Sequence, residues 1–238
     1  MRGVAHLSIS ALLCQCFALL VFKDFTPIPL LIGAIFGLIA DIDEDQSKIS
    51  YMLVGKLGGP KRIGGVNHHK TDVKYNSRIK KIRQIAITLV VLFIGFILYI
   101  LSKKNIFFLL GCMYISILPW TKHRSLSHSI LSSLVVGTCA YLGFKTYGLS
   151  KYGIYCGIGY FLHVFEDFFT VSGVPLFYPI SKKRFKVPLM STGTKKGSIV
   201  EFAFMVISFC LCVITYFSYV VPKAAPTIKN IFESYMSF

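Results

Sequence analysis

Apolar residues occur in seven stretches that approach the length a transmembrane helix needs. They lie near residues 4–22, 27–42, 85–101, 105–120, 127–144, 152–170 and 199–221. Crossing the hydrocarbon core takes about 20 apolar residues, so the second and fourth stretches are short and could instead be re-entrant or interfacial. The pattern predicts an all-α, polytopic membrane protein with about six or seven transmembrane helices, folded as a single integral membrane domain over residues 1–238.

Composition and charge support this prediction. The chain is 54% hydrophobic and only 15% charged, whereas soluble domains carry about 25% charged residues. Its net charge is +16, and an excess of Lys and Arg marks the cytoplasmic side of a membrane protein. A cytoplasmic N-terminus places most of the 26 basic residues inside, chiefly in two basic loops at 43–84 and 171–198. We therefore expect a multi-pass protein of the cell inner (plasma) membrane.

With this topology, histidines and carboxylates gather at the cytoplasmic ends of the expected helices. They are His6, Asp41, Asp43, His123, His128, His163, Glu166, Asp167 and Glu201. An ionisable group beside a transmembrane helix costs roughly 2.5–3.5 kcal/mol on insertion scales. Such residues need a partner or a use, so their gathering on one side of the membrane predicts a functional site there.

His163 and Asp167 form the most specific pair. They are four residues apart on an expected helix, which is the spacing by which one helical face offers two ligands to one metal ion. Glu166 also neighbours His163 and could be a third ligand, a residue that orients the imidazole, or a general base. The same spacing would also fit a helix-stabilising pair at the interface.

Two further histidines, His123 and His128, stand just before an expected helix. Residues five apart diverge on a continuous helix, so the two can share a site only if the helix begins between them, with Ser125 or Ser127 as its N-cap. The free N–H groups of such a helix start, with Arg124 nearby, would suit a phosphate. A charged interfacial hairpin is the alternative.

An acidic segment closes the second stretch. Asp41 and Asp43 would point to opposite sides of a regular helix, so Asp41 is the expected inward ligand and Asp43 the residue that bridges or orients. An acidic helix end that pairs with loop lysines would look similar. At the last stretch, Ser198 and Glu201 have the spacing of a capping box, which gives Glu201 a structural role.

Four motifs then follow one another in a recognisable order. They are His6 in the first helix, Asp41-Ile-Asp43, His123-Arg124-x-x-Ser127-His128-Ser129, and Gly159-x-x-x-His163-x-x-x-Asp167-x-x-Thr170-x-x-Gly173 followed by Pro175-Leu-Phe-Tyr-Pro179. Together they resemble the family of bacterial inner-membrane, LexA-binding, metal-dependent hydrolases. The departures are Ser125 and Ser127, where the family commonly has Gly and Thr, and the long loop that carries Asn67-His68-His69. More distantly, the order of ligands is similar to that of zinc-dependent phospholipase C and related single-strand nucleases, which hold a multinuclear zinc cluster.

The leading hypothesis is therefore a membrane-bound, metal-dependent hydrolase. The resemblance and the residues together imply a divalent metal, zinc by its mixed N/O ligands with manganese or iron as alternatives, held by the following residues: His6, Asp41, His123, His128, His163 and Asp167. Asp43 or Glu166 would orient or deprotonate a water whose pKa the metal lowers towards about 7. Arg124, with Lys122, would hold an anionic oxygen.

A phosphoester such as a lipid phosphate is the expected substrate, because the site would open at headgroup depth. The basic residues around it are Lys182, Lys183, Arg184 and Lys186. The loop at 43–84 suits anionic membrane lipid; its charge would also suit nucleic acid, for which the sequence offers no further sign. Two alternatives remain open: a proton or metal-ion transporter that uses the same residues as a relay, and a non-catalytic scaffold that binds a regulatory protein or anionic lipid.

Overall fold

The computed structural model describes residues 3–44, 47–54, 77–191 and 193–236, and the chain within these ranges is helical, with no β-strand. The helices are α1 Gly3–Phe17, α2 Ile28–Ile39, α3 Lys48–Val54, α4 Ser77–Leu101, α5 Ile106–Ile117, α6 Ile130–Lys145, α7 Ser150–Phe168 and α8 Lys195–Met236. The prediction of an all-α protein is confirmed for this part of the chain.

Among the described residues, three helical segments are long and apolar enough to cross a membrane: Gly3–Phe22, Lys80–Leu101 and Lys195–Tyr219. Two shorter apolar segments, Ile106–Trp120 and Ile130–Lys145, accompany them. Each of the seven predicted stretches overlaps a helix, while α3 falls inside the predicted 43–84 loop. Residues 55–76 of that loop lie outside the described residues. The number of spans and the side of the N-terminus stay predictions.

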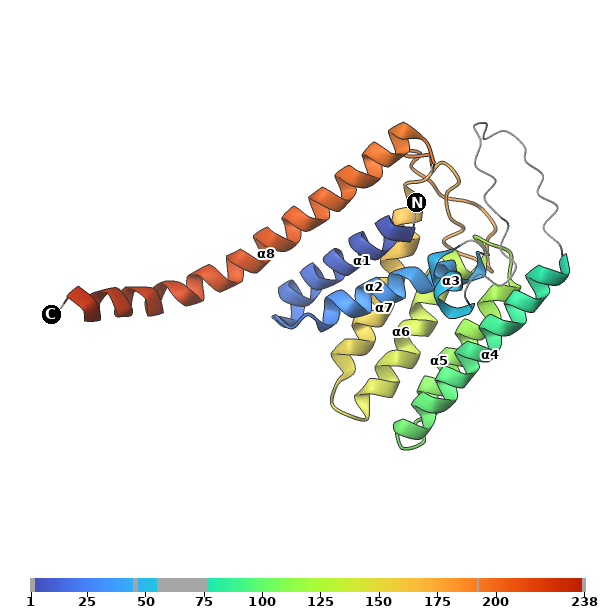
Figure 1. Ribbon diagram of the computed structural model, residues 1–238, viewed down its shortest axis with the longest axis horizontal. Coiled ribbons are helices and arrows are strands. Elements are labelled where there is room, and N and C mark those ends of the chain that lie inside the picture. The colour runs from blue at the N-terminus through green and yellow to red at the C-terminus, as the bar shows by residue number, and fades with distance from the viewer. Residues whose placement is uncertain (1–2, 45–46, 55–76, 192, 237–238) are drawn as a thin grey trace.

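The helices form one bundle with a protruding tail (Figure 1). α1, α2, α7 and α6 pack in succession, and the α4–α5 pair packs against α6. The first part of α8 packs along α1, and its C-terminal part extends away from the other helices. The N-terminus, α3 and the irregular segment between α7 and α8 all lie at one end of the bundle. That end carries the candidate site.

The cap predicted for α6 was wrong by a few residues. Ser129 is the N-cap, and its side chain accepts a hydrogen bond from the Ser132 N–H. Neither Ser125 nor Ser127 caps this helix, because residues 126–128 form a separate 3-10 turn before it. The turn breaks the helix between His123 and His128 and frees Ser127 for contacts with the site.

The last helix begins earlier and ends later than predicted. α8 starts at Lys195, and Thr194 Oγ1 accepts a hydrogen bond from the Gly197 N–H at its first turn. Ser198 and Glu201 therefore lie inside the helix, and the capping-box interpretation was wrong. Glu201 is instead buried, with 1% of its surface exposed.

Small residues let three helices approach closely. A Cβ added to Gly37 would lie 2.5 Å from the Ser10 Cβ, and one added to Gly33 would lie 2.6 Å from the Cys14 Cβ. A Cβ on Gly159 would lie 3.0 Å from the Gly33 Cα. Stripes of small residues spaced by four are the usual means by which membrane helices pack backbone to backbone. Here they hold α1, α2 and α7 together.

At the opposite end of α1 from His6, an ion pair between the buried Asp24 and the partly exposed Lys151 joins the α1–α2 connection to α7. Asp24 Oδ2 accepts hydrogen bonds from Lys151 Nζ at 2.7 Å and from the Tyr155 hydroxyl at 3.2 Å. Its other oxygen accepts from the Thr26 N–H and hydroxyl. Burial opposes ionisation of Asp24, but the hydrogen bonds from Lys151 and Thr26 outweigh it and lower the pKa of the carboxyl.

Replacement of Gly37 by alanine tests the close packing. We expect Gly37→Ala to lower the free energy of unfolding by about 1–3 kcal/mol, because the added methyl group meets Ser10 with no space to move into. The control is Ile35→Ala on the same helix, where the side chain is 54% exposed. Thermal unfolding in detergent measures both, and a Gly37→Ala protein as stable as the parent would contradict the packing argument.

Replacement of Asp24 by asparagine tests the ion pair through pH. A lowered pKa means that the ionised carboxylate contributes stability above its unfolded pKa of about 3.9. That contribution is lost as the pH falls through the lower folded pKa. Asp24→Asn should therefore unfold at a lower temperature than the parent at pH 7, and the two midpoints should converge as the pH drops below about 4. A difference that stays constant with pH would contradict this account.

Candidate metal centre

Every residue predicted as a ligand or catalytic group lies at the same end of the bundle. His6 comes from the start of α1, Asp41 and Asp43 from the 3-10 turn Ala40–Asp43 that follows α2, and His128 from the 3-10 turn Leu126–His128. His163, Glu166 and Asp167 come from the last turns of α7. His123 and Arg124 come from the loop before α6. Segments far apart in the sequence thus supply one cluster.

Three donor atoms form a nearly equilateral triangle at its centre. His128 Nε2 lies 3.3 Å from His163 Nε2, and Asp41 Oδ1 lies 3.4 Å from each of these nitrogens. Four ligands around zinc at 2.0–2.1 Å would be about 3.3–3.4 Å apart in a regular tetrahedron. The triangle therefore has the dimensions of one face of such a tetrahedron.

Asp167 and His6 extend the cluster. Asp167 Oδ2 lies 3.4 Å from His128 Nε2, and its Oδ1 lies 3.4 Å from His6 Nε2. The His6 and His163 rings stack with centroids 3.9 Å apart. Within the described residues, two sets of three donors are compact enough for a metal ion: His6, His163 and Asp167 in one, and Asp41, His123 and His128 in the other. The two sets are contiguous, so the cluster has donors for more than one ion.

Hydrogen bonds on the far side fix the imidazoles of His163 and His6. His163 Nδ1 donates to the Gly37 carbonyl oxygen over 2.6 Å, and because a carbonyl can only accept, Nδ1 carries the proton. His6 Nδ1 donates to Glu166 Oε2 over 2.7 Å, while Glu166 Oε1 accepts from the Ser10 hydroxyl. In its neutral form, each ring therefore turns an unprotonated Nε2 towards the cluster.

The imidazoles of His123 and His128 are fixed in the same way, by an acceptor at Nδ1. His123 Nδ1 donates to Asp43 Oδ1 over 2.9 Å. Ser127 donates its hydroxyl proton to Asp43 Oδ2 over 2.5 Å, so its oxygen accepts from His128 Nδ1 over 2.8 Å. Asp43 thus orients both rings. Both of its oxygens are occupied, as are those of Glu166, so these two acids stand behind the imidazoles and away from the open side of the cluster.

Arg124 approaches from that open side. Its Nη2 lies 2.9 Å from Asp167 Oδ2, and its Nη1 donates to the Thr170 hydroxyl over 3.1 Å. The residue has a φ of +58°, a left-handed conformation that is uncommon for a side chain of this kind. Backbone strain of this sort persists where the surrounding contacts hold it, often at functional sites.

A cavity of about 420 Å³ opens directly above the donors. It is lined by His6, Asp41, Glu44, His123, Arg124, Asp167, Ser172 and Arg184. Sequence reasoning missed Glu44 and Ser172, although Glu44 stands next to Asp43 in the acidic run. Its Oε2 lies 3.4 Å from His123 Nε2. The predicted ligands therefore face a space large enough for a small molecule.

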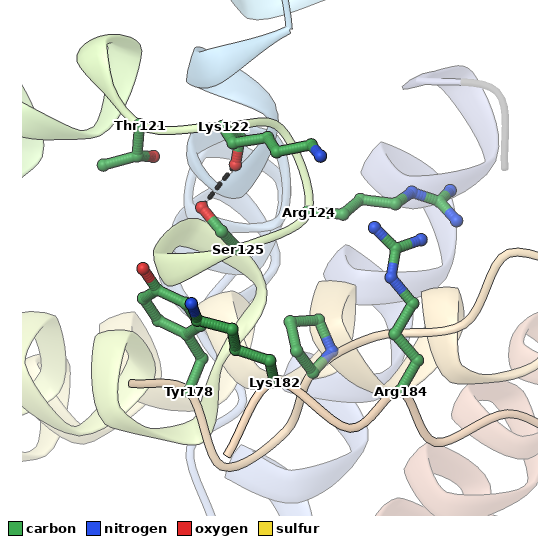
Figure 2. Close-up of a pocket in the computed structure, with 8 residues that line it drawn as sticks. Thr121, Lys122, Arg124, Ser125, Tyr178, Lys182 and Arg184 are labelled. Carbon is green, nitrogen blue, oxygen red and sulfur yellow. Dashed lines mark hydrogen bonds between the residues drawn. The ribbon is translucent and has the colours of Figure 1, made fainter. Parts of the chain in front are cut away.

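The predicted basic ring is only partly around this cavity. Arg184 lines it, whereas Lys122 and Lys182 line a neighbouring cavity instead (Figure 2). Lys186 donates to the Val171 carbonyl, and Lys183 Nζ lies 5.6 Å from the centroid of the Phe185 ring, within cation–π distance. Neither residue lines either of the two cavities. The irregular segment after α7 thus directs alternate basic residues towards and away from the site.

Comparison with known proteins places the chain in a family. No curated protein and no solved structure matches it. The model of a family described as YdjM inner membrane protein matches residues 1–222. This agrees with the resemblance to a bacterial inner-membrane family, and the match carries no information on hydrolysis or on LexA binding. The chain belongs to the YdjM inner membrane protein family and, with its several membrane-length helices, is a multi-pass protein of the inner membrane.

Proposed function

We propose that this protein is a membrane-bound, metal-dependent hydrolase whose His/Asp cluster holds a divalent metal, most suitably zinc. The observation that carries the proposal is the orientation of the imidazoles: each Nδ1 meets an acceptor, so the Nε2 lone pairs point into one space. Carboxylate oxygens of Asp41 and Asp167 point into the same space. With the rings neutral, acceptor atoms so close together repel one another, and a metal cation held among them would remove that repulsion.

The donor set also limits which cation fits. Imidazole nitrogens with carboxylate oxygens suit zinc, with manganese or iron as alternatives, whereas calcium and magnesium prefer oxygen alone. His128, His163 and Asp41 would hold one ion, and His6 and Asp167 supply further donors for that ion or for a second one. Glu166 and Asp43 would raise the basicity of the rings that they orient.

Hydrolysis needs a proton acceptor on the open side of the cluster, and His123 is the best placed. Its side chain is 33% exposed, whereas those of His6, His128 and His163 are at most 1% exposed. Asp43 behind it would stabilise the imidazolium, as an acid behind a catalytic histidine does. A bound metal would supply the activated water. His123 would take the proton of that water and return it to the leaving group.

The arginines at the cavity indicate the class of substrate. Arg124 and Arg184 line a space whose floor consists of acids and imidazoles, and guanidinium groups bind phosphate through paired hydrogen bonds. A phosphate ester would therefore place its oxygens between the metal and the arginines. Because the protein is embedded in a membrane, a lipid-borne phosphate has the shortest path to this site.

Metal content of the full chain in detergent tests the centre. We expect at least one equivalent of zinc per chain and a loss of zinc affinity of at least about tenfold in Asp167→Asn. The control is Asp24→Asn, which also replaces a buried, ion-paired aspartate but at the other end of α1. Equal zinc affinity in both variants, or no binding of zinc, manganese or iron by the parent, would contradict the centre.

Phosphate release from a lipid monophosphate in mixed micelles tests the activity. We expect release that a chelator abolishes and zinc restores, and a loss in His123→Gln of at least about 100-fold, the usual contribution of a general acid–base. The zinc content of His123→Gln separates proton transfer from metal binding: a variant that keeps zinc but loses phosphate release has lost the base, and one that loses both has lost a ligand. Metal binding without hydrolysis, together with ion flux in proteoliposomes, would instead favour the transporter.

A further inference from the structure

A second cavity, shown in Figure 2, adjoins the one above the metal centre and has the opposite charge. Its volume is about 490 Å³, and Lys122, Arg124, Lys182 and Arg184 supply four cations to its walls without any carboxylate. Arg124 and Arg184 line both cavities. One space with acidic and imidazole walls therefore continues into one with cationic walls, across a boundary made of two arginines.

Of the four cations of the second cavity, only Arg124 has an acid partner within the described residues. Arg124 pairs with Asp167, and Arg184 donates to the Ser172 carbonyl over 3.3 Å. In the part of the chain that the structure describes, neither Lys122 nor Lys182 has a carboxylate within ion-pair distance. Four like charges around one space repel one another, and an anion bound between them would remove that repulsion.

Two backbone segments hold these charges in place. Lys122 and Arg124 belong to the loop before α6, and Lys182 and Arg184 to the segment after α7. The second segment is fixed by reciprocal hydrogen bonds between Val174 and Phe185, of 3.0 and 2.9 Å. It is also tied to the start of α6, where the Ile130 N–H donates to the Leu176 carbonyl. The cationic cavity is therefore built before any ligand arrives.

We propose that this cationic cavity binds a second phosphate of the substrate, so that the substrate is a diphosphate. The inference rests on the proposed hydrolase and names its substrate class. The terminal phosphoryl group would lie at the metal centre, the adjoining phosphate between Lys122 and Lys182, and the two shared arginines would contact both. Adjacent phosphates on one molecule fit this arrangement because the same guanidinium groups line both cavities.

The cationic cavity would then act on the leaving group. Water attacks the terminal phosphorus: a new P–O bond forms, and the bond from that phosphorus to the bridging oxygen breaks. His123 takes one proton of the water, and the electron pair of the broken bond stays on the bridging oxygen. The products are orthophosphate and a monophosphate. Lys122 and Lys182 stabilise the charge that develops on that monophosphate, which a monoester substrate could not exploit.

Binding of non-hydrolysable analogues tests the second subsite without catalysis. The zinc-loaded full chain in detergent should bind methylenediphosphonate at least about tenfold more tightly than methylphosphonate, which is the effect of one additional charge-assisted hydrogen bond. Lys122→Gln with Lys182→Gln should abolish this preference and leave methylphosphonate affinity within about twofold. Equal affinity for the two analogues in the parent, or an equal loss of both in the variant, would overturn the inference.

A matched control comes from the same segment. Lys183→Gln with Lys186→Gln also removes two positive charges, from residues that line neither cavity. This protein should keep the parent's preference for methylenediphosphonate. If it loses the preference as the first variant does, the general positive potential of the surface explains the binding, and the built subsite is overturned.

Phosphate release from three substrates shows whether the diphosphate belongs to a lipid or to a nucleotide. It also tests the preference for a diphosphate separately from the hydrolase activity. The substrates are farnesyl diphosphate in micelles, ADP, and farnesyl monophosphate. Faster release from farnesyl diphosphate than from ADP would indicate a lipid, and the reverse order a soluble nucleotide; both support the inference. Zinc-dependent release that is fastest from farnesyl monophosphate would overturn the diphosphate and keep the hydrolase. Absence of zinc-dependent phosphate release from all three substrates would overturn both the diphosphate substrate and the hydrolase.

Discussion

The contact of α1, α2 and α7 through Gly33, Gly37 and Gly159 sets the position of the central donors. If larger side chains at these glycines held the helices further apart, the Gly37 carbonyl oxygen could not reach His163 Nδ1, which now lies 2.6 Å from it. The same contact places the Ser10 hydroxyl on Glu166, which in turn holds His6. Helix packing in a membrane has no hydrophobic driving force of its own and relies on such close fits. The candidate metal centre and the helix interface are thus one structure.

That interface also explains how so many ionisable groups can be buried together. An unpaired charge in a low-dielectric interior is expensive, and the usual remedy is a partner with good geometry. Here the acids divide into two kinds. Asp43 and Glu166 use their oxygens on imidazole N–H and serine hydroxyl groups, whereas Asp41 and Asp167 turn oxygens towards the Nε2 atoms. The first kind orients the imidazoles, and the second lines the proposed metal site.

The sequence was informative about the helices and about which residues gather, because both follow from patterns along the chain. Apolar length predicts a helix, and a charge count predicts which helix ends share one side, so the convergence of His6, Asp41, His128 and His163 could be expected. Which acid faces which ring depends on the glycine contacts and on the 3-10 turns, and local spacing does not encode these. Hence the spacing allows Glu166 to be a base, whereas its oxygens meet His6 and Ser10. Likewise it predicts Ser127 as a helix cap, whereas the Ser127 hydroxyl bonds Asp43 and His128.

In the segment after α7, too, the sequence does not show which way the side chains point, and here their directions decide which of them line the cationic cavity. The basic residues of this segment predict positive charge near the site; they are Lys182, Lys183, Arg184 and Lys186. The sequence does not tell which of these side chains face the site. The hydrogen bonds between Val174 and Phe185 fix the segment, so that Lys182 and Arg184 line the cationic cavity and Lys183 lies over Phe185. A uniform ring of charge would attract any anion. In the proposed complex, positive charge lies on one side of the acidic donors, and two arginines are shared by the two cavities. An anion would therefore lie along the line between the cavities. A diphosphate would contact both of them and so bind more tightly than a monophosphate, which would contact one.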